Sequence, residues 1–258
     1  MRVLVTNDDG VEAPGLHALA TALHRAGHDV VVVAPSGERS GSGAAIGRLH
    51  RAGPIAWQQV TWPDLEGVAV HSVDLPPAAA VYAGCLGAFG PRPDVVASGV
   101  NPGLNYGHLV LHSGTVGAAL TAGVLGVPAV AVSIKWDDEQ QWATAATLAV
   151  GAVGWSAGEA SAKVVNLSVP NLPLEKVRGV REASLAPFNE DWSARTEPGE
   201  LLLEYVGHHH DPAPGTDLAV VGEGWAAVTV LSGIGSAEGA APGLTDAVAG
   251  LLSPGAAA

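Results

Sequence analysis

Short runs of apolar residues alternate with segments whose apolar residues recur every three to four positions. Residues 2–6 form a β-branched run, residues 14–26 carry leucines at helical spacing, and residues 29–34 form a valine-rich run. This order predicts a strand, a helix and a second strand. Because both strands are too uniformly apolar to have one face in water, they fit a parallel sheet that helices cover on both sides.

The same pattern recurs further along the chain. It predicts helices over residues 78–89 and 115–125 and strands over residues 94–98 and 129–134. Alternating strands and helices are typical of a doubly wound α/β fold. We therefore expect a Rossmann-like core with a mostly parallel sheet over residues 1–170.

The pattern of apolar and polar residues changes after residue 170. Residues 177–183, 201–206 and 226–231 are alternating segments separated by polar loops, a pattern typical of antiparallel strands or hairpins. We expect a β-rich arm or subdomain over residues 171–235, which serves oligomerisation and can also be integral to the core. Residues 236–258 are rich in Ala, Gly and Pro, which predicts a weakly ordered tail.

Composition restricts the class of partner. Hydrophobic residues make up 48% of the chain and charged residues 14%, as in a well-packed globular protein. The 12 Lys and Arg residues against 25 Asp and Glu residues give a formal net charge of -13, which argues against a nucleic-acid polymer as a partner. A small phosphorylated ligand remains compatible if a cation and a helix N-terminus reverse the field locally.

The chain also carries signals of its location. Cys85 is the single cysteine, so no intrachain disulfide can form. Residues 1–6 run directly into a polar cluster, without the apolar stretch of a secretory signal. The long apolar region at residues 113–134 is interrupted by Gly123, Gly126 and Pro128, which argues against a membrane span. We expect a cytoplasmic protein.

Two acidic residues follow the first predicted strand. Ligands of an open parallel sheet bind where loops leave the carboxyl ends of its strands, and Asp8 and Asp9 lie at such a position. Adjacent carboxylates repel each other unless a cation lies between them, and oxygen ligands suit Mg²⁺, Mn²⁺ or Ca²⁺. The alternative is that one of them caps the turn into the helix.

Two later loops carry polar side chains at equivalent positions. Ser40 and Ser42, after the second strand, could bind a metal or a phosphate, although such Ser/Gly loops are often simple connections. Asn101 and Asn105, after the strand at residues 94–98, could offer a carbonyl oxygen to a metal or an amide to phosphate. The alternative here is a glycine-rich turn.

A possible anion site comes next. Ser113, Gly114 and Thr115 lie at the start of the helix predicted at residues 115–125. Free backbone N–H groups at a helix start, together with hydroxyl groups, can bind phosphate. An ordinary N-cap is the alternative. Together with a metal on the first loop, this helix start could hold a phosphate ester.

With these motifs in order, the sequence resembles the SurE (survival protein E) family of 5'/3'-nucleotidases. The similarity covers most of the chain, to about residue 231, and is carried by an NDDG segment, an RSG loop, an SGVNPGLNYG loop and an SGTVGAA helix start, with weaker matches later. These segments are residues 5–15, 39–41, 98–107 and 113–119, followed by residues 166–170 and 215–217.

The resemblance implies an assignment of site residues. A divalent metal, Mg²⁺ or Mn²⁺, would be held by four side chains: Asp8, Asp9, Ser40 and Asn101. The phosphate would be contacted by four residues: Asn105, Ser113, Gly114 and Thr115. It also implies a swapped or extended C-terminal arm and a homodimer or homotetramer.

The expected activity is that of a metal-dependent phosphomonoesterase acting on nucleoside monophosphates. We expect hydrolysis by a metal-activated water that Asp8 or Asp9 orients or deprotonates, with the helix start stabilising charge on the phosphate. A second mechanism is open, in which Asp8 attacks phosphorus and forms an aspartyl-phosphate.

The chain departs from the family pattern at two helices. Ala79 stands near the place of a common acidic residue, and Thr121 replaces a frequent Glu. A rival interpretation is therefore a catalytically weakened nucleotide- or metal-binding paralogue. A Rossmann-type oxidoreductase is less compatible, because residues 7–10 stand where G-x-G-x-x-G should follow the first strand.

Overall fold

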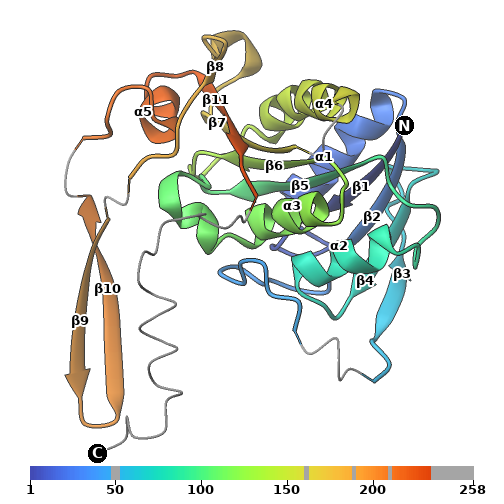
Figure 1. Cartoon of the computed structure of the whole chain (residues 1–258), viewed down its shortest axis with the longest axis horizontal. Helices are drawn as coiled ribbons and strands as arrows, with labels where there is room; N and C mark the ends of the chain where they lie inside the picture. Colours follow the sequence, from blue (N-terminus) through green and yellow to red (C-terminus); the bar gives the residue numbers. More distant parts are fainter. Residues whose placement is uncertain (48–52, 160–162, 188–189, 209–210, 234–258) are drawn as a thin grey trace, which may run out of the picture.

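A nine-stranded mixed sheet forms the centre of the molecule, with a two-stranded hairpin beside it (Figure 1). The computed structural model describes residues 1–47, 53–159, 163–187, 190–208 and 211–233. The tail expected at residues 236–258 lies outside the described residues.

The order of the large sheet is β3-β4-β2-β1-β5-β6-β7-β11-β8. Strands β4, β2, β1, β5, β6 and β7 run parallel, whereas β3 is antiparallel to β4 and β11 is antiparallel to β7. The predicted mostly parallel α/β sheet is therefore confirmed. Its strands are β1 (Arg2–Thr6), β2 (Asp29–Pro35), β3 (Trp57–Val60), β4 (Ala69–Val73), β5 (Val95–Pro102), β6 (Ala129–Ile134), β7 (Val164–Val169), β8 (Val180–Glu182) and β11 (Ala226–Leu231).

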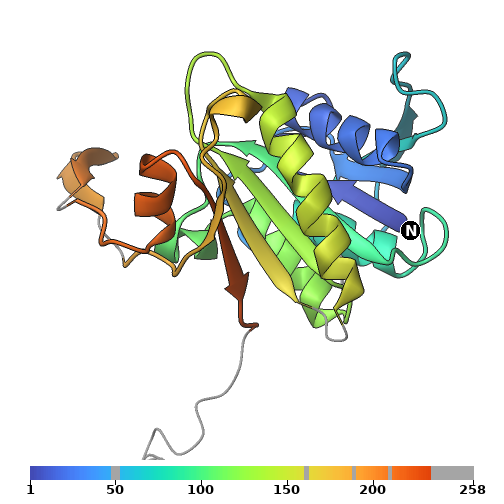
Figure 2. The ribbon, with the colours of Figure 1, turned by 90° about the horizontal axis from the view of Figure 1, so that it is seen from above.

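Helices cover both faces of the sheet. Helices α1 and α4 pack on one face, which is nearer the viewer in Figure 2, and α2 and α3 pack on the other. The helical elements are α1 (Pro14–Arg25), α2 (Pro77–Cys85), α3 (Gly114–Val124), α4 (Trp142–Gly158), α5 (Asp217–Gly222) and the short 3-10 turns η2 (Gly107–Leu111) and η3 (Leu174–Lys176). Helix α2 ends four residues before the expected position, at Cys85.

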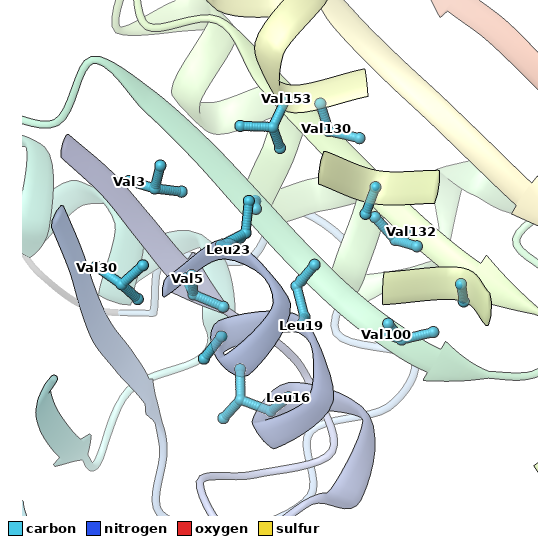
Figure 3. Close-up of a cluster of buried hydrophobic side chains, with 14 of the residues drawn as sticks. Val3, Val5, Leu16, Leu19, Leu23, Val30, Val100, Val130, Val132 and Val153 are labelled. Carbon is cyan, nitrogen blue, oxygen red and sulfur yellow. The ribbon is translucent and has the colours of Figure 1, made fainter. Parts of the chain in front are cut away.

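The larger apolar core lies between α1, α4 and the sheet. Leu16, Leu19 and Leu23 are fully buried, and Figure 3 shows them beside valines of β1, β5 and β6. The leucines repeat at helical spacing and the strands are apolar on both faces, so each element buries the side that its sequence makes apolar.

The C-terminal third contributes to two sheets. β9 (Glu190–Glu197) and β10 (Glu200–His208) form a separate antiparallel hairpin, while β11 and β8 extend the large sheet. β8 runs parallel to β11, whereas the alternating sequence had suggested antiparallel pairing throughout this region. The difference arises because β8 and β11 are not joined by a tight turn: the hairpin and α5 lie between them in the sequence.

The topology fixes where a ligand can bind. From β1 the chain goes to β2 and β4 on one side, then returns to β5 on the other side of β1. The carboxyl ends of β1 and β5 therefore flank a topological switch point, the usual ligand position in open α/β sheets. Among the described residues, no helix combines the length and apolar character needed to cross a membrane.

Candidate active site

The turn after β1 presents Asp8 and Asp9 at the switch point. The buried side chain of Asn7 closes this turn, because its Nδ2 donates to the Gly10 carbonyl (2.9 Å) and its Oδ1 accepts from the Gly10 N–H (3.3 Å). Gly10 has φ +105°, and a Cβ there would lie 3.1 Å from Cα of Gly37. The two carboxylates therefore lie on a rigid turn that needs glycine at its exit.

Asp8 is almost completely buried, with 3% of its surface exposed. Its Oδ1 accepts a short hydrogen bond from the Thr115 hydroxyl, and its backbone carbonyl accepts from the Arg39 N–H at 2.6 Å. Burial raises the pKa of Asp8, while the Thr115 hydroxyl and N–H groups at the start of α3 oppose that rise. Asp8 is thus oriented by the helix that was expected to bind phosphate.

Asp9 has a different environment. Its Oδ2 is buried and has no hydrogen-bond partner in the described part of the chain. Burial, followed by repulsion from Asp8 and Glu38, raises the pKa of Asp9 to about 7. A buried carboxylate oxygen without a donor, beside two other acids, is an electrostatic arrangement that a cation would relieve.

Gly114 brings three segments together at one point. A Cβ on Gly114 would lie 2.7 Å from Oδ2 of Asp8 and 2.7 Å from the Ser42 hydroxyl oxygen. Since only a glycine allows this approach, the start of α3 touches both the turn after β1 and the loop after β2. The Ser42 hydroxyl is buried and has no partner within the described ranges.

The other two expected metal ligands lie on neighbouring segments at the same edge of the sheet. Ser40 is exposed on the loop after β2. Asn101 is half-buried at the end of β5, which continues to Pro102 past the expected end at residue 98, and its Nδ2 donates to the Gly103 carbonyl (2.7 Å). The bond commits the amide nitrogen of Asn101 to the backbone, so a cation would meet its carbonyl oxygen.

Asn105, an expected phosphate contact, is held from behind by side chains of β6 and β7. Its N–H donates to the Ser133 hydroxyl (3.0 Å), and its carbonyl accepts from Nδ2 of Asn166 (2.7 Å) and from the Ser168 hydroxyl (3.4 Å). The sequence pattern alone assigned no role to these three residues. The available signal was the presence of polar residues inside strands that are otherwise uniformly apolar.

The start of α3 has the form expected of a capped helix. Ser113 is the N-cap, and its hydroxyl oxygen accepts from the Val116 N–H at 3.1 Å. Because the hydroxyl accepts in this bond, its own proton is left to donate to an anion. The N-cap and anion-site interpretations of this motif are therefore compatible.

Both departures from the family pattern lie in packed helix interiors. Ala79 is a residue of α2 that is buried in the core, and the Thr121 hydroxyl donates to the Gly117 carbonyl one turn earlier in α3 (2.7 Å). Within the described part of the chain, neither side chain hydrogen-bonds to Asp8, Asp9 or Asn105. The substitutions are accommodated by packing.

Comparison with known proteins decides the family. The family model described as "Survival protein SurE" matches residues 3–191. The chain belongs to the SurE family. This membership confirms the resemblance found in the motifs.

Individual SurE relatives are similar over nearly their whole length. A 5'/3'-nucleotidase SurE of Serratia proteamaculans is 38% identical, with 90% of each protein covered. A 5'-nucleotidase SurE of Gloeobacter violaceus is 35% identical, with 90% of this chain and 89% of the relative covered. The crystal structure of a SurE protein from Aquifex aeolicus matches with a TM-score of 0.75 and 28% identity, covering 90% of this chain and 93% of that one.

Proposed function

We propose that this chain is a divalent-metal-dependent phosphomonoesterase that hydrolyses nucleoside monophosphates to a nucleoside and phosphate. The observation that carries the proposal is the contact of Asp8 with the start of α3, through the Thr115 hydroxyl and the close approach at Gly114. This contact brings a site suited to a cation against one suited to an anion. Its SurE relatives bear the names 5'-nucleotidase and 5'/3'-nucleotidase.

The donor set fits a hard cation. The described residues include no group of three or more His, Cys, Asp or Glu side chains that could hold one ion. The site would therefore use two carboxylates with a hydroxyl and an amide oxygen, which suits Mg²⁺ or Mn²⁺. The four side chains that would hold the ion are Asp8, Asp9, Ser40 and Asn101. When bound, the ion supplies positive charge to phosphoryl oxygens and lowers the pKa of water.

Asp8 and Asp9 would have separate roles. Asp8 is held in place by Thr115 and Arg39, so it would act as a fixed ligand. Asp9 keeps an unpartnered oxygen, so it would accept the proton of the attacking water. Water oxygen bonds to phosphorus, the ester P–O bond breaks, and the departing alkoxide takes a proton from solvent.

Residues of two loops would bind the phosphate. Asn105 would donate from Nδ2, which is buried and without a partner among the described residues. Ser113 would donate from its hydroxyl, and Gly114 and Thr115 from the start of α3, whose dipole favours an anion. The buried hydrogen bond that the Thr115 hydroxyl donates to Asp8 makes direct attack by Asp8 the weaker route.

The decisive experiment is a phosphate-release assay on nucleoside monophosphates with Mg²⁺, Mn²⁺ or EDTA. We expect metal-stimulated turnover by the wild type and a loss of roughly 100-fold or more in Asp9→Ala, judged by the size of general-base effects. Asp64→Ala, which removes an exposed carboxylate near His17, is the matched control and should retain activity. Equal turnover in Asp9→Ala and the wild type would refute the site.

The direct-water route has its own test. Hydrolysis in ¹⁸O-labelled water should place the label in released phosphate in a single-turnover reaction, with no acyl-phosphate on the protein. An enzyme-bound acyl-phosphate, trapped on Asp8, would show the covalent route instead.

We also propose that the β9–β10 hairpin is an oligomerisation arm that joins this chain into a homodimer or homotetramer. Its apolar side chains face solvent: Leu201 is 65% exposed and Leu203 is 62% exposed. Exposed apolar side chains gathered on one element support the proposal of a protein interface there. In the same proposal, residues 1–170 supply the catalytic core and residues 171–235 supply the arm and its supports. The lone buried Cys85 suits a cytoplasmic location.

A further inference from the structure

A buried carboxylate outside the metal and phosphate sets holds the end of the Asn101 to Gly107 loop. Asp217, at the first position of α5, is 1% exposed. Its Oδ2 accepts from the Gly107 N–H at 2.7 Å, and its Oδ1 accepts from the Ala186 N–H at 3.0 Å and the Leu218 N–H at 2.8 Å. Hydrogen bonds to an ionised acceptor are among the stronger ones in proteins.

The same carboxylate connects the loop to the base of the hairpin. Ala186 lies shortly before β9, and Ser184 exchanges backbone hydrogen bonds with this region: its carbonyl accepts from Asp217 N–H (2.9 Å) and its N–H donates to Gly215 (3.1 Å). Gly107 adopts φ +52°, and a Cβ there would lie 2.5 Å from the Ala186 carbonyl oxygen. Loop and hairpin base are thus in direct backbone contact.

The position of Asn105 depends on this attachment. Its backbone is fixed on one side by Ser133 and Asn166 of the central sheet. Two residues later, the N–H of Gly107 is held by Asp217. Between these two anchors, the buried Nδ2 of Asn105 has no hydrogen-bond partner within the described residues. The anchors determine where that donor points.

We propose that Asp217 is a positioning residue, which places the Asn105 side chain for phosphate binding and couples it to the base of the β9–β10 hairpin. The inference rests on the proposed function, because it takes Asn105 as a phosphate ligand. Asp217 itself lies behind the loop and acts through Gly107 and Ala186.

The test replaces Asp217 by Asn. An amide has one acceptor oxygen and one N–H₂ group. Its N–H₂ group would therefore face at least one of the backbone N–H groups that donate to the carboxylate, and the hydrogen bond from that N–H would be lost. We expect KM for a nucleoside monophosphate and the inhibition constant for inorganic phosphate each to rise about tenfold, the scale of a lost charge-assisted hydrogen bond. We expect kcat to change less, and amide hydrogen exchange at Gly107 to accelerate.

Thr229→Val is the matched control. Thr229, on β11, is also buried, and its hydroxyl donates to the Ala183 carbonyl (2.9 Å) and not to the Asn101 to Gly107 loop. This variant loses a buried hydrogen bond in the same region, and its KM and phosphate inhibition should match the wild type. If Asp217→Asn does not fold, Asp217→Glu keeps the charge, displaces it by one methylene, and is measured in its place.

The outcomes separate the two proposals. A wild type without metal-dependent phosphate release overturns the proposed function, and the inference falls with it. An active wild type whose Asp217 variant shows the same KM, phosphate inhibition and Gly107 exchange as Thr229→Val overturns the inference alone. A raised KM and inhibition constant confined to the Asp217 variant supports it.

Discussion

Asp8 and Asp9 are neighbours in sequence but differ in what surrounds their carboxylates. Asp8 receives hydrogen bonds that favour its charged form, whereas Asp9 has an oxygen without a donor in the described structure. The difference follows from the turn, which points one side chain at the start of α3 and the other beside Glu38. Environment alone can assign unlike roles to like groups.

The raised pKa of Asp9 predicts a pH-dependent stability. Its folded pKa of about 7 exceeds the ordinary aspartate pKa of 3.8, so the folded state binds a proton more tightly than the unfolded state does. This contribution is fully present below the unfolded pKa and is lost as the pH rises through about 7. Urea unfolding in EDTA should show wild type losing stability against Asp9→Asn across that window, by at most about 1.4 kcal/mol per pH unit.

Saturating Mg²⁺ is the control for this prediction, because a cation favours the charged carboxylate and should flatten the difference. Parallel pH profiles for the wild type and Asp9→Asn in EDTA would contradict the environment described for Asp9.

The sequence predicts site residues at positions that follow from strand ends and helix starts. Asp8, Asp9 and the 113–115 segment were proposed in this way, and the structure brings Asp8 into contact with Thr115 and the start of α3. The sequence pattern assigned no role to Asn166 or Asp217, because each contacts the backbone of a loop distant in sequence. Such contacts exist only once the fold has formed.

At the scale of elements, strongly periodic segments were predicted well. β1 and β6 have the expected bounds, and α1 ends one residue early. Weakly patterned elements were not predicted. Examples are β3, an edge strand whose residues Gln58 and Gln59 are exposed, and α5, which has only six residues. Short or edge elements depend on neighbours that a local pattern does not reveal.

The packing of α1 on the sheet predicts a large loss of folding stability when one of its buried side chains is truncated. Leu19→Ala should lower the free energy of unfolding by about 2 to 5 kcal/mol, because it leaves a cavity in a core where the leucine is fully buried. For Leu86→Ala, at a leucine that is 78% exposed, the free energy of unfolding should stay within about 0.5 kcal/mol of the wild-type value. Both variants are measured by urea unfolding. Similar losses for the two variants would contradict the described core.

At the scale of the whole molecule, the hairpin predicts association. Replacing Leu201 and Leu203 together by Ser should lower the mass measured by light scattering after size-exclusion chromatography, because exposed apolar surface drives assembly. Leu174→Ser, at an exposed leucine outside the hairpin, should leave the mass unchanged. A monomeric wild type, or an unchanged mass in the double variant, would contradict the oligomerisation proposal.

The pairing of β7 with β11 has a consequence for synthesis on the ribosome. β7 is complete at residue 169, yet the strand that satisfies its outer backbone groups is residues 226–231, which emerge only after the hairpin and α5. During that interval a strand whose residues are all buried in the folded chain presents open N–H and C=O groups, and unpaired strand edges of this kind promote aggregation of nascent chains. A nascent chain ending before residue 226 is therefore expected to engage holdase chaperones.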